Sequence, residues 1–135
     1  MLPVEFLFTM RATLDGPTII PNAPHGTRIL VPVTGGEVTG PKVNGTLRAH
    51  GGDWVTMRPD GTAQLDVRVT ILTDDGAAIF MEYKGILTTG ENRTIRTAPL
   101  FQTGDERYTW LNSVQAVATG ETGDGDVTYQ VYAVR

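Results

Sequence analysis

The sequence predicts an all-β domain, a single closed antiparallel barrel of about eight to ten strands that spans residues 1–135. Apolar and polar residues alternate with period two in several stretches, as half-buried strands require. Turns rich in Gly, Pro and Asp separate these stretches, and no stretch sustains the 3.6-residue period of a helix. Barrel closure is favoured because it leaves no unpaired strand edge, and a β-sandwich is the second candidate.

The first predicted strand covers residues 4–14. Val4, Phe6, Phe8, Met10 and Ala12 alternate with polar residues there, so the pattern predicts that these five share one buried face. Residues 15–26, rich in Gly and Pro, follow as a loop.

The clearest pair of strands covers residues 62–73 and 77–87, joined by an Asp-Asp-Gly turn that is typical of a β-hairpin. In the first of the two, Leu65, Val67, Val69 and Ile71 share one face. The remaining predicted strands cover residues 27–33, 37–49, 53–57, 94–101, 113–119 and 127–134. Between them we expect little or no helix, at most one turn near residues 105–110. The strands follow one another through short connections, which predicts a meander.

Composition excludes several classes of function. The chain has a net charge of −4 and no cluster of Lys or Arg, so a nucleic-acid partner is not expected. It has no cysteine, which excludes disulfides, thiolate catalysis and cysteine-ligated zinc. Residues 1–14 lack the features of a signal peptide, and no apolar run is long enough to span a membrane. We therefore expect a cytoplasmic protein without a membrane partner.

The first candidate for chemistry is Asp53 followed by Trp54, just after two glycines. A partly buried carboxyl group has a raised pKa and can act as a general acid or base near neutral pH, and Trp54 could wall a substrate. The alternative is a turn aspartate that bonds nearby backbone, with Trp54 in the core.

The second candidate is the pair Asp66 and Arg68, which leave the same face of one strand because they are two residues apart. If that face lines the barrel, Asp66 could move a proton and Arg68 could hold an oxyanion. If it faces solvent, they are an ordinary exposed pair.

The third candidate is the stretch that holds Tyr108, Trp110 and Asn112. Its aromatic rings and its amide group suit a small aromatic or carbonyl substrate, which makes the three residues candidate binding residues. The alternative is a plug of side chains that closes one end of the barrel. His25 and His50 lie far apart in loops without a defined third ligand, so neither a metal nor another cofactor is expected.

Six segments spread over nearly the whole chain resemble, in the same order, the DUF3237 family of small β-barrel proteins, also called UPF0311. They are residues 31–45 (VPVTGGEVTGPKVNG), 51–54 (GGDW), 58–61 (RPDG), 65–68 (LDVR), 73–76 (TDDG) and 101–112 (FQTGDERYTWLN). The resemblance implies a compact antiparallel barrel but little about activity, because the family is largely uncharacterised. Members usually carry a longer insertion before residue 94, where this chain has only residues 88–93. If the insertion forms part of a lid, the site is more open here.

Three functions are compatible with these observations. The first is a cofactor-independent enzyme that performs acid–base chemistry of the lyase, hydratase, isomerase or cyclase type on a small organic molecule in the barrel. The others are a non-catalytic barrel that binds a small molecule and a structural or assembly domain. A homodimer is expected under all three, because symmetric dimers are the commonest soluble oligomers.

Overall fold

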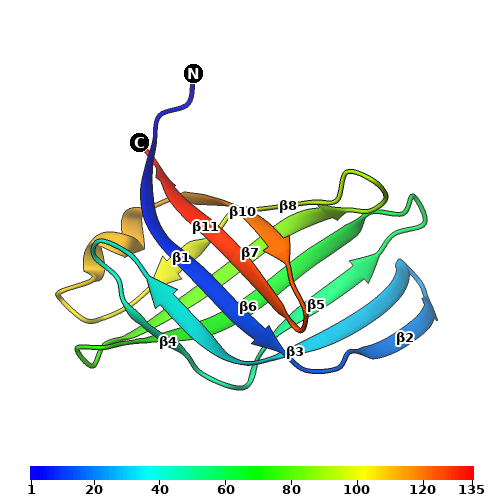
Figure 1. The fold of residues 1–135 in the computed structure, drawn as a ribbon, viewed down its shortest axis with the longest axis horizontal. Helices are drawn as coiled ribbons and strands as arrows, with labels where there is room; N and C mark the ends of the chain where they lie inside the picture. The colour runs from blue at the N-terminus through cyan, green and yellow to red at the C-terminus, as the bar shows by residue number, and fades with distance from the viewer.

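Eight strands close into an antiparallel barrel in the computed structural model, which describes residues 1–135 (Figure 1). Around the ring the order is β1, β3, β5, β6, β7, β8, β10 and β11, and β11 pairs with β1 again. Each barrel strand therefore pairs with the next barrel strand along the chain. The predicted closed, meander-like barrel is confirmed.

The eight barrel strands are β1 (Val4–Leu14), β3 (Gly26–Thr39), β5 (Gly51–Met57), β6 (Ala63–Thr73), β7 (Ala78–Thr88), β8 (Thr94–Thr97), β10 (Ala116–Thr122) and β11 (Asp126–Val134). Three short strands extend this ring. They are β2 (Thr18–Ala23), which pairs only with β3, β4 (Gly45–Leu47), which pairs with β3 and β6, and β9 (Leu100–Gln102), which pairs with β7. The helical content is one 3-10 helix, η1 (Thr109–Ser113), close to the turn that the sequence indicates.

Strand β6 shows how the alternation of the sequence decides which side chains enter the barrel. Leu65, Val67, Val69 and Ile71 are buried in the interior, and the polar residues between them point outward. Period two fixes this choice, because a shift of one residue would expose the whole apolar set to water.

Strand β1 departs from the expected alternation. Its register with β11 shifts between Phe6 and Phe8, so Leu7 and Phe8 are both buried while Phe6 stays 39% exposed. Outside the barrel, Phe6 packs edge-on against Tyr132 with ring centroids 5.7 Å apart. The expectation that Val4 and Phe6 share the buried face of Phe8 is therefore wrong, because a β-bulge reverses the side on which residues emerge.

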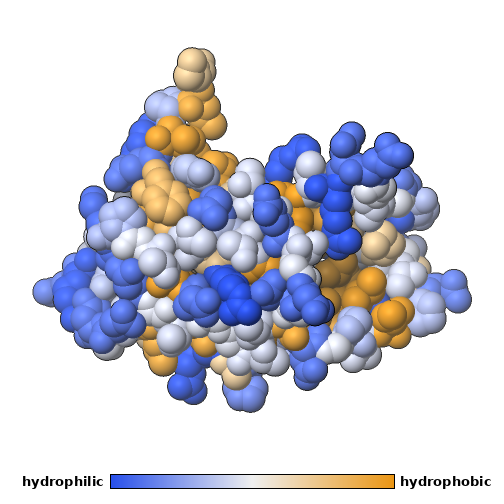
Figure 2. Space-filling model, in the orientation of Figure 1, coloured by the Kyte–Doolittle hydropathy of each residue, from blue (hydrophilic) through white to orange (hydrophobic).

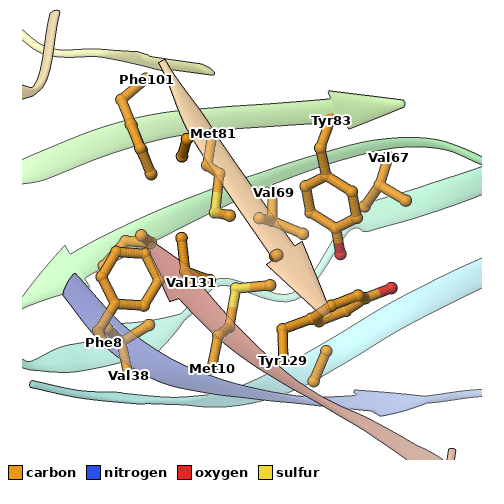
Figure 3. Close-up of a cluster of buried hydrophobic side chains, with 14 of the residues drawn as sticks. Phe8, Met10, Val38, Val67, Val69, Met81, Tyr83, Phe101, Tyr129 and Val131 are labelled. Atoms are coloured by element: carbon orange, nitrogen blue, oxygen red, sulfur yellow. The ribbon is translucent and has the colours of Figure 1, made fainter. Parts of the chain in front are cut away.

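One end of the barrel is filled by large side chains. Phe8 and Phe101 meet edge to face with centroids 6.0 Å apart, and Met10, Met81 and Leu111 are fully buried there. Figure 3 shows the two phenylalanines and the methionines packed together on one side of the interior. We call this end, which η1 covers, the packed end. In Figure 1 it is the left end, and the β5–β6 and β7–β8 loops lie at the right.

Most of the visible surface is hydrophilic or neutral, with hydrophobic colour near the N-terminus and on the side where β2 lies (Figure 2). The exposed apolar residues there include Leu2 and Val4 before and within β1, and Ile19 and Ile20 in β2. None of the helical segments is long and apolar enough to cross a membrane.

The bulge predicts losses of stability of different size for two phenylalanines that are only two residues apart. Phe8→Ala removes a ring from the packed end, so the free energy of unfolding in urea should fall by roughly 3–5 kcal/mol. Phe6→Ala should lower the free energy of unfolding by about 1 kcal/mol, because it removes one aromatic contact at the surface, with Tyr132. Equal losses for the two variants would contradict the placement of the bulge.

Candidate functional site

The end of the barrel opposite η1 holds a cavity of about 160 Å³. Its walls are mostly apolar and include Leu14, Val33, Val55, Val67 and Val127. A buried apolar cavity of about 150 Å³ holds one benzene molecule, so this cavity matches a single small ring.

Asp53 is the only carboxyl group that lines the cavity. In β5 it pairs with Val31 of β3 on one side and with Val67 of β6 on the other. Its Oδ1 accepts a hydrogen bond from the backbone N–H of Asp66 at 3.1 Å. This bond fixes the carboxyl group against the barrel wall.

Burial raises the pKa of Asp53 from 3.8 to about 6. The hydrogen bond from the Asp66 backbone stabilises the carboxylate and opposes this shift, whereas the negative charge of the Asp66 side chain adds to it. At neutral pH the group is therefore mostly ionised, yet it takes up a proton at a pH close to that of cells. A general acid or base needs this property.

Tyr83 and Tyr129 bring two phenol groups to the same cavity from β7 and β11. Their rings meet edge to face with centroids 5.3 Å apart, and both residues are buried. Figure 3 shows both hydroxyl oxygens on the side away from Phe8 and Phe101. Burial is the main cause of a raised pKa for both, and the charge of Asp53 adds to it, so both stay protonated at neutral pH.

Strand pairing sets the depth of these groups. Asp53 pairs with Val67, and Val67 pairs with Tyr83, so the carboxyl and phenol groups stand at one level two strands apart, about 10 Å at the backbone. Tyr129 has room because its neighbour on β10 is Gly120, where a Cβ atom would lie 2.7 Å from the ring.

Asp66 and Arg68 do not reach the cavity. They leave the outer face of β6, where they pair with Lys84 and Glu82 of β7. Arg68 lies over the ring of Trp54, 5.5 Å from its centroid, so Trp54 also lies outside. Asp66 and Arg68 therefore face solvent, as the second of the two sequence interpretations predicts. Only Asp53 among the expected catalytic residues lines the cavity.

Tyr108, Trp110 and Asn112 lie at the packed end. The hydroxyl of Tyr108 donates to the carboxylate of Asp75 at 2.8 and 2.9 Å, and Asn112 exchanges two hydrogen bonds with the backbone of Thr103. Lys42 lies 5.5 Å from the centroid of the Trp110 ring. Tyr108 is buried there, Trp110 is half-buried and Asn112 is exposed, at the end of the barrel opposite the cavity.

Tyr83, Tyr129 and Arg93 are not among the site residues that the sequence patterns predict. A signal was available for the tyrosines, because each occupies an inward position of an alternating strand, beside Met81 and Val131 respectively. A tyrosine at such a position brings a polar group into the barrel interior. No group of three or more His, Asp or Glu side chains is arranged to hold a metal ion, and His25 and His50 are in none.

The fold and the cavity define a class: small closed antiparallel barrels with an apolar interior that holds one acid and two phenols. Residues 2–134 match the model of the family described as protein of unknown function DUF3237, and the chain belongs to this family. The UPF0311 protein blr7842 of Bradyrhizobium diazoefficiens is 32% identical over 148 residues, which cover 98% of this chain and 97% of that protein.

Two solved structures and a named enzyme are also similar to this chain. The crystal structure of the conserved protein RPA1785 from Rhodopseudomonas palustris, described as of unknown function, superposes with a TM-score of 0.95 at 28% identity. It covers 100% of this chain and 99% of that one. The hydroalkoxylation enzyme phnH of Penicillium herquei is 35% identical over 117 residues, which cover 86% of this chain and 72% of the enzyme. A crystal structure of an enzyme from the same fungus superposes with a TM-score of 0.81 at 29% identity, covering 99% and 95% of the two chains.

The raised pKa of Asp53 predicts a pH-dependent cost to folding. The folded state holds this proton more tightly than the unfolded state, so stability falls as pH rises from about 4 to about 6. Asp53→Asn keeps the acceptor for the Asp66 N–H but cannot ionise. The variant should gain about 2–3 kcal/mol over the wild type between pH 4 and pH 7, measured by urea unfolding. Parallel pH profiles for the two proteins would contradict the shift.

Proposed function

We propose that this protein is an acid–base enzyme that adds an O–H group across a carbon–carbon double bond, or removes it, in a small apolar molecule held in the barrel. The observation that carries the proposal is the position of Asp53 as the single carboxyl group in a mostly apolar cavity, with its pKa at about 6. Such a group exchanges protons readily at neutral pH.

In the proposed reaction Asp53 first donates a proton to the substrate and then takes one up from it. The protonated carboxyl gives its proton to one alkene carbon, and the other carbon becomes electron-deficient. An oxygen of the substrate forms a bond to this second carbon and loses its own proton. The Asp53 carboxylate takes up that proton, so the substrate is isomerised, the enzyme returns to its starting state and no cofactor is required.

The two tyrosines support this reaction as hydrogen-bond donors. Because Tyr83 and Tyr129 stay protonated at neutral pH, each can donate to the substrate oxygen and orient it. The apolar walls exclude water from the reacting carbons, which strengthens the electrostatic effect of the carboxylate.

The named activity of one relative supports the reaction class. The Penicillium herquei protein is called a hydroalkoxylation enzyme, and hydroalkoxylation is the addition of an alcohol O–H across a double bond. The similarity extends over 86% of this chain, and both the strands that bear Asp53 and those that bear the tyrosines belong to the barrel.

A non-catalytic barrel that binds the same kind of molecule is the second candidate, and it is favoured by the apolar walls alone. The two functions differ in whether a bound molecule is chemically changed. A purely structural domain accounts less well for a cavity that contains an acid with a raised pKa. The expected homodimer is a separate proposal, which light scattering of the purified protein tests.

The simplest test of the enzyme uses 2-allylphenol, whose cyclisation to 2-methyl-2,3-dihydrobenzofuran is an isomerisation. The wild type should form this product faster than buffer does, and Asp53→Asn should lower kcat by roughly 100-fold or more, because the proton carrier is lost. The product is measured by gas chromatography.

The matched control is Asp66→Asn, which removes a carboxylate from the outer face and keeps the backbone N–H that bonds Asp53. It should keep the wild-type rate. A rate equally reduced in both variants, or unchanged in Asp53→Asn, would remove Asp53 as the proton carrier. Binding of 2-allylphenol without turnover would favour the second candidate.

A further inference from the structure

The cavity has one charged group of each sign. Asp53 is its only carboxyl group and Arg93, in the loop between β7 and β8, is its only cation. The two groups stand at different depths. Leu87 pairs with Ala63 and Ile95 near the mouth, and Tyr83 lies four residues deeper along β7, at the level of Asp53. Four residues of strand span about 13 Å, so Arg93 at the mouth and Asp53 stand well apart along the barrel.

Arg93 is the arginine of this end that makes no ion pair and no side-chain hydrogen bond within the chain. The neighbouring arginines are engaged. They are Arg11 with Asp126 at 2.8 Å, Arg28 with Thr56 at 2.6 Å, and Arg58 with Asp60 at 3.1 Å. The guanidinium of Arg93 is exposed at the mouth, so it is available to a ligand.

Glu121 shares a second groove with Arg93, beside β8 and β10. No ion pair forms between them within 4 Å. Arg93 therefore faces two spaces, and only the cavity has mostly apolar walls, which suit the body of a small apolar molecule.

We propose that Arg93 selects substrates that carry a carboxylate, binding it at the mouth while the apolar part of the molecule fills the cavity. A guanidinium presents two parallel N–H groups that match the two oxygens of a carboxylate. One cation balances one negative charge, so a monoanion fits better than a phosphate. The inference rests on the proposed function only in assigning the bound molecule as substrate.

This arrangement also fixes the direction in which the substrate lies. The carboxylate of Asp53 repels a second anion, so the charged end of the ligand stays at Arg93. The opposite end then lies beside Asp53, Tyr83 and Tyr129, where the proton is exchanged. Arg93 is thus a specificity residue that orients the substrate without contact with the reacting bond.

The test compares two probes of the same shape and different charge, benzoate and nitrobenzene. Each has a six-membered ring with a planar two-oxygen group, but only benzoate is charged. Binding is followed by NMR through the shifts of the Val55 and Val67 methyl groups, which line the cavity. The wild type should prefer benzoate, and Arg93→Gln should weaken benzoate about tenfold while leaving nitrobenzene unchanged.

The matched control is Arg96→Gln, which removes the same positive charge three residues further along the chain. The Arg96 side chain donates a hydrogen bond to Thr94. It should bind benzoate as the wild type does, which separates a specific contact from a change in net charge. Because both arginines are exposed, both variants should fold as the wild type does, and their amide NMR spectra check this.

Three outcomes would overturn the inference. They are equal affinity of the wild type for the two probes, an equal loss of benzoate binding in Arg93→Gln and Arg96→Gln, and no shift of the cavity methyl groups with either probe. The first two leave the role of Asp53 untouched, because turnover of 2-allylphenol requires no anionic group. The third contradicts binding in the cavity and therefore the proposed function as well.

Discussion

The pairing of β1 with both β3 and β11 closes the sheet, and the rest of the structure depends on this closure. A closed sheet has an inside, so every barrel strand must divide its residues between the interior and solvent. Closure also removes the free edges that an open sheet of this length would present to other chains. The β-bulge near Leu7 belongs to the same strand and adjusts it at the packed end, where the interior is filled.

The barrel interior is filled at one end and has a cavity at the other, so the residues that stabilise the fold lie apart from those of the candidate site. Phenylalanine, methionine and leucine side chains fill the packed end, whereas a cavity remains at the other. The space contains Asp53, which is costly to ionise in apolar surroundings. A group that lowers stability when charged is held in place by the barrel wall, as is typical of sites where a raised pKa serves a reaction.

The sequence predicted the fold well because alternation in strands such as β6 and β7 has one stable arrangement once the barrel closes. The register of β6 also places Asp66 and Arg68 outside the barrel. The apolar alternation from Leu65 to Ile71 favours this placement by itself. Strand β5 was harder, since Asp53 points inward and Trp54 outward, opposite to their polarities. The sequence could name Asp53 as a candidate, but the groups around it come from β7, β11 and a loop. Only the closed barrel brings these together.

The separation of a packed end from an open end also bears on how such a protein can change over generations. The Rhodopseudomonas palustris protein keeps nearly the same backbone although it shares fewer than a third of its residues with this chain. Loops at the open end contribute little to the buried core, so they can lengthen, shorten or exchange a charged residue at small cost to folding. Drift in residues 89–93 can therefore change the charge at the mouth of the cavity while selection on the opposite end preserves the barrel.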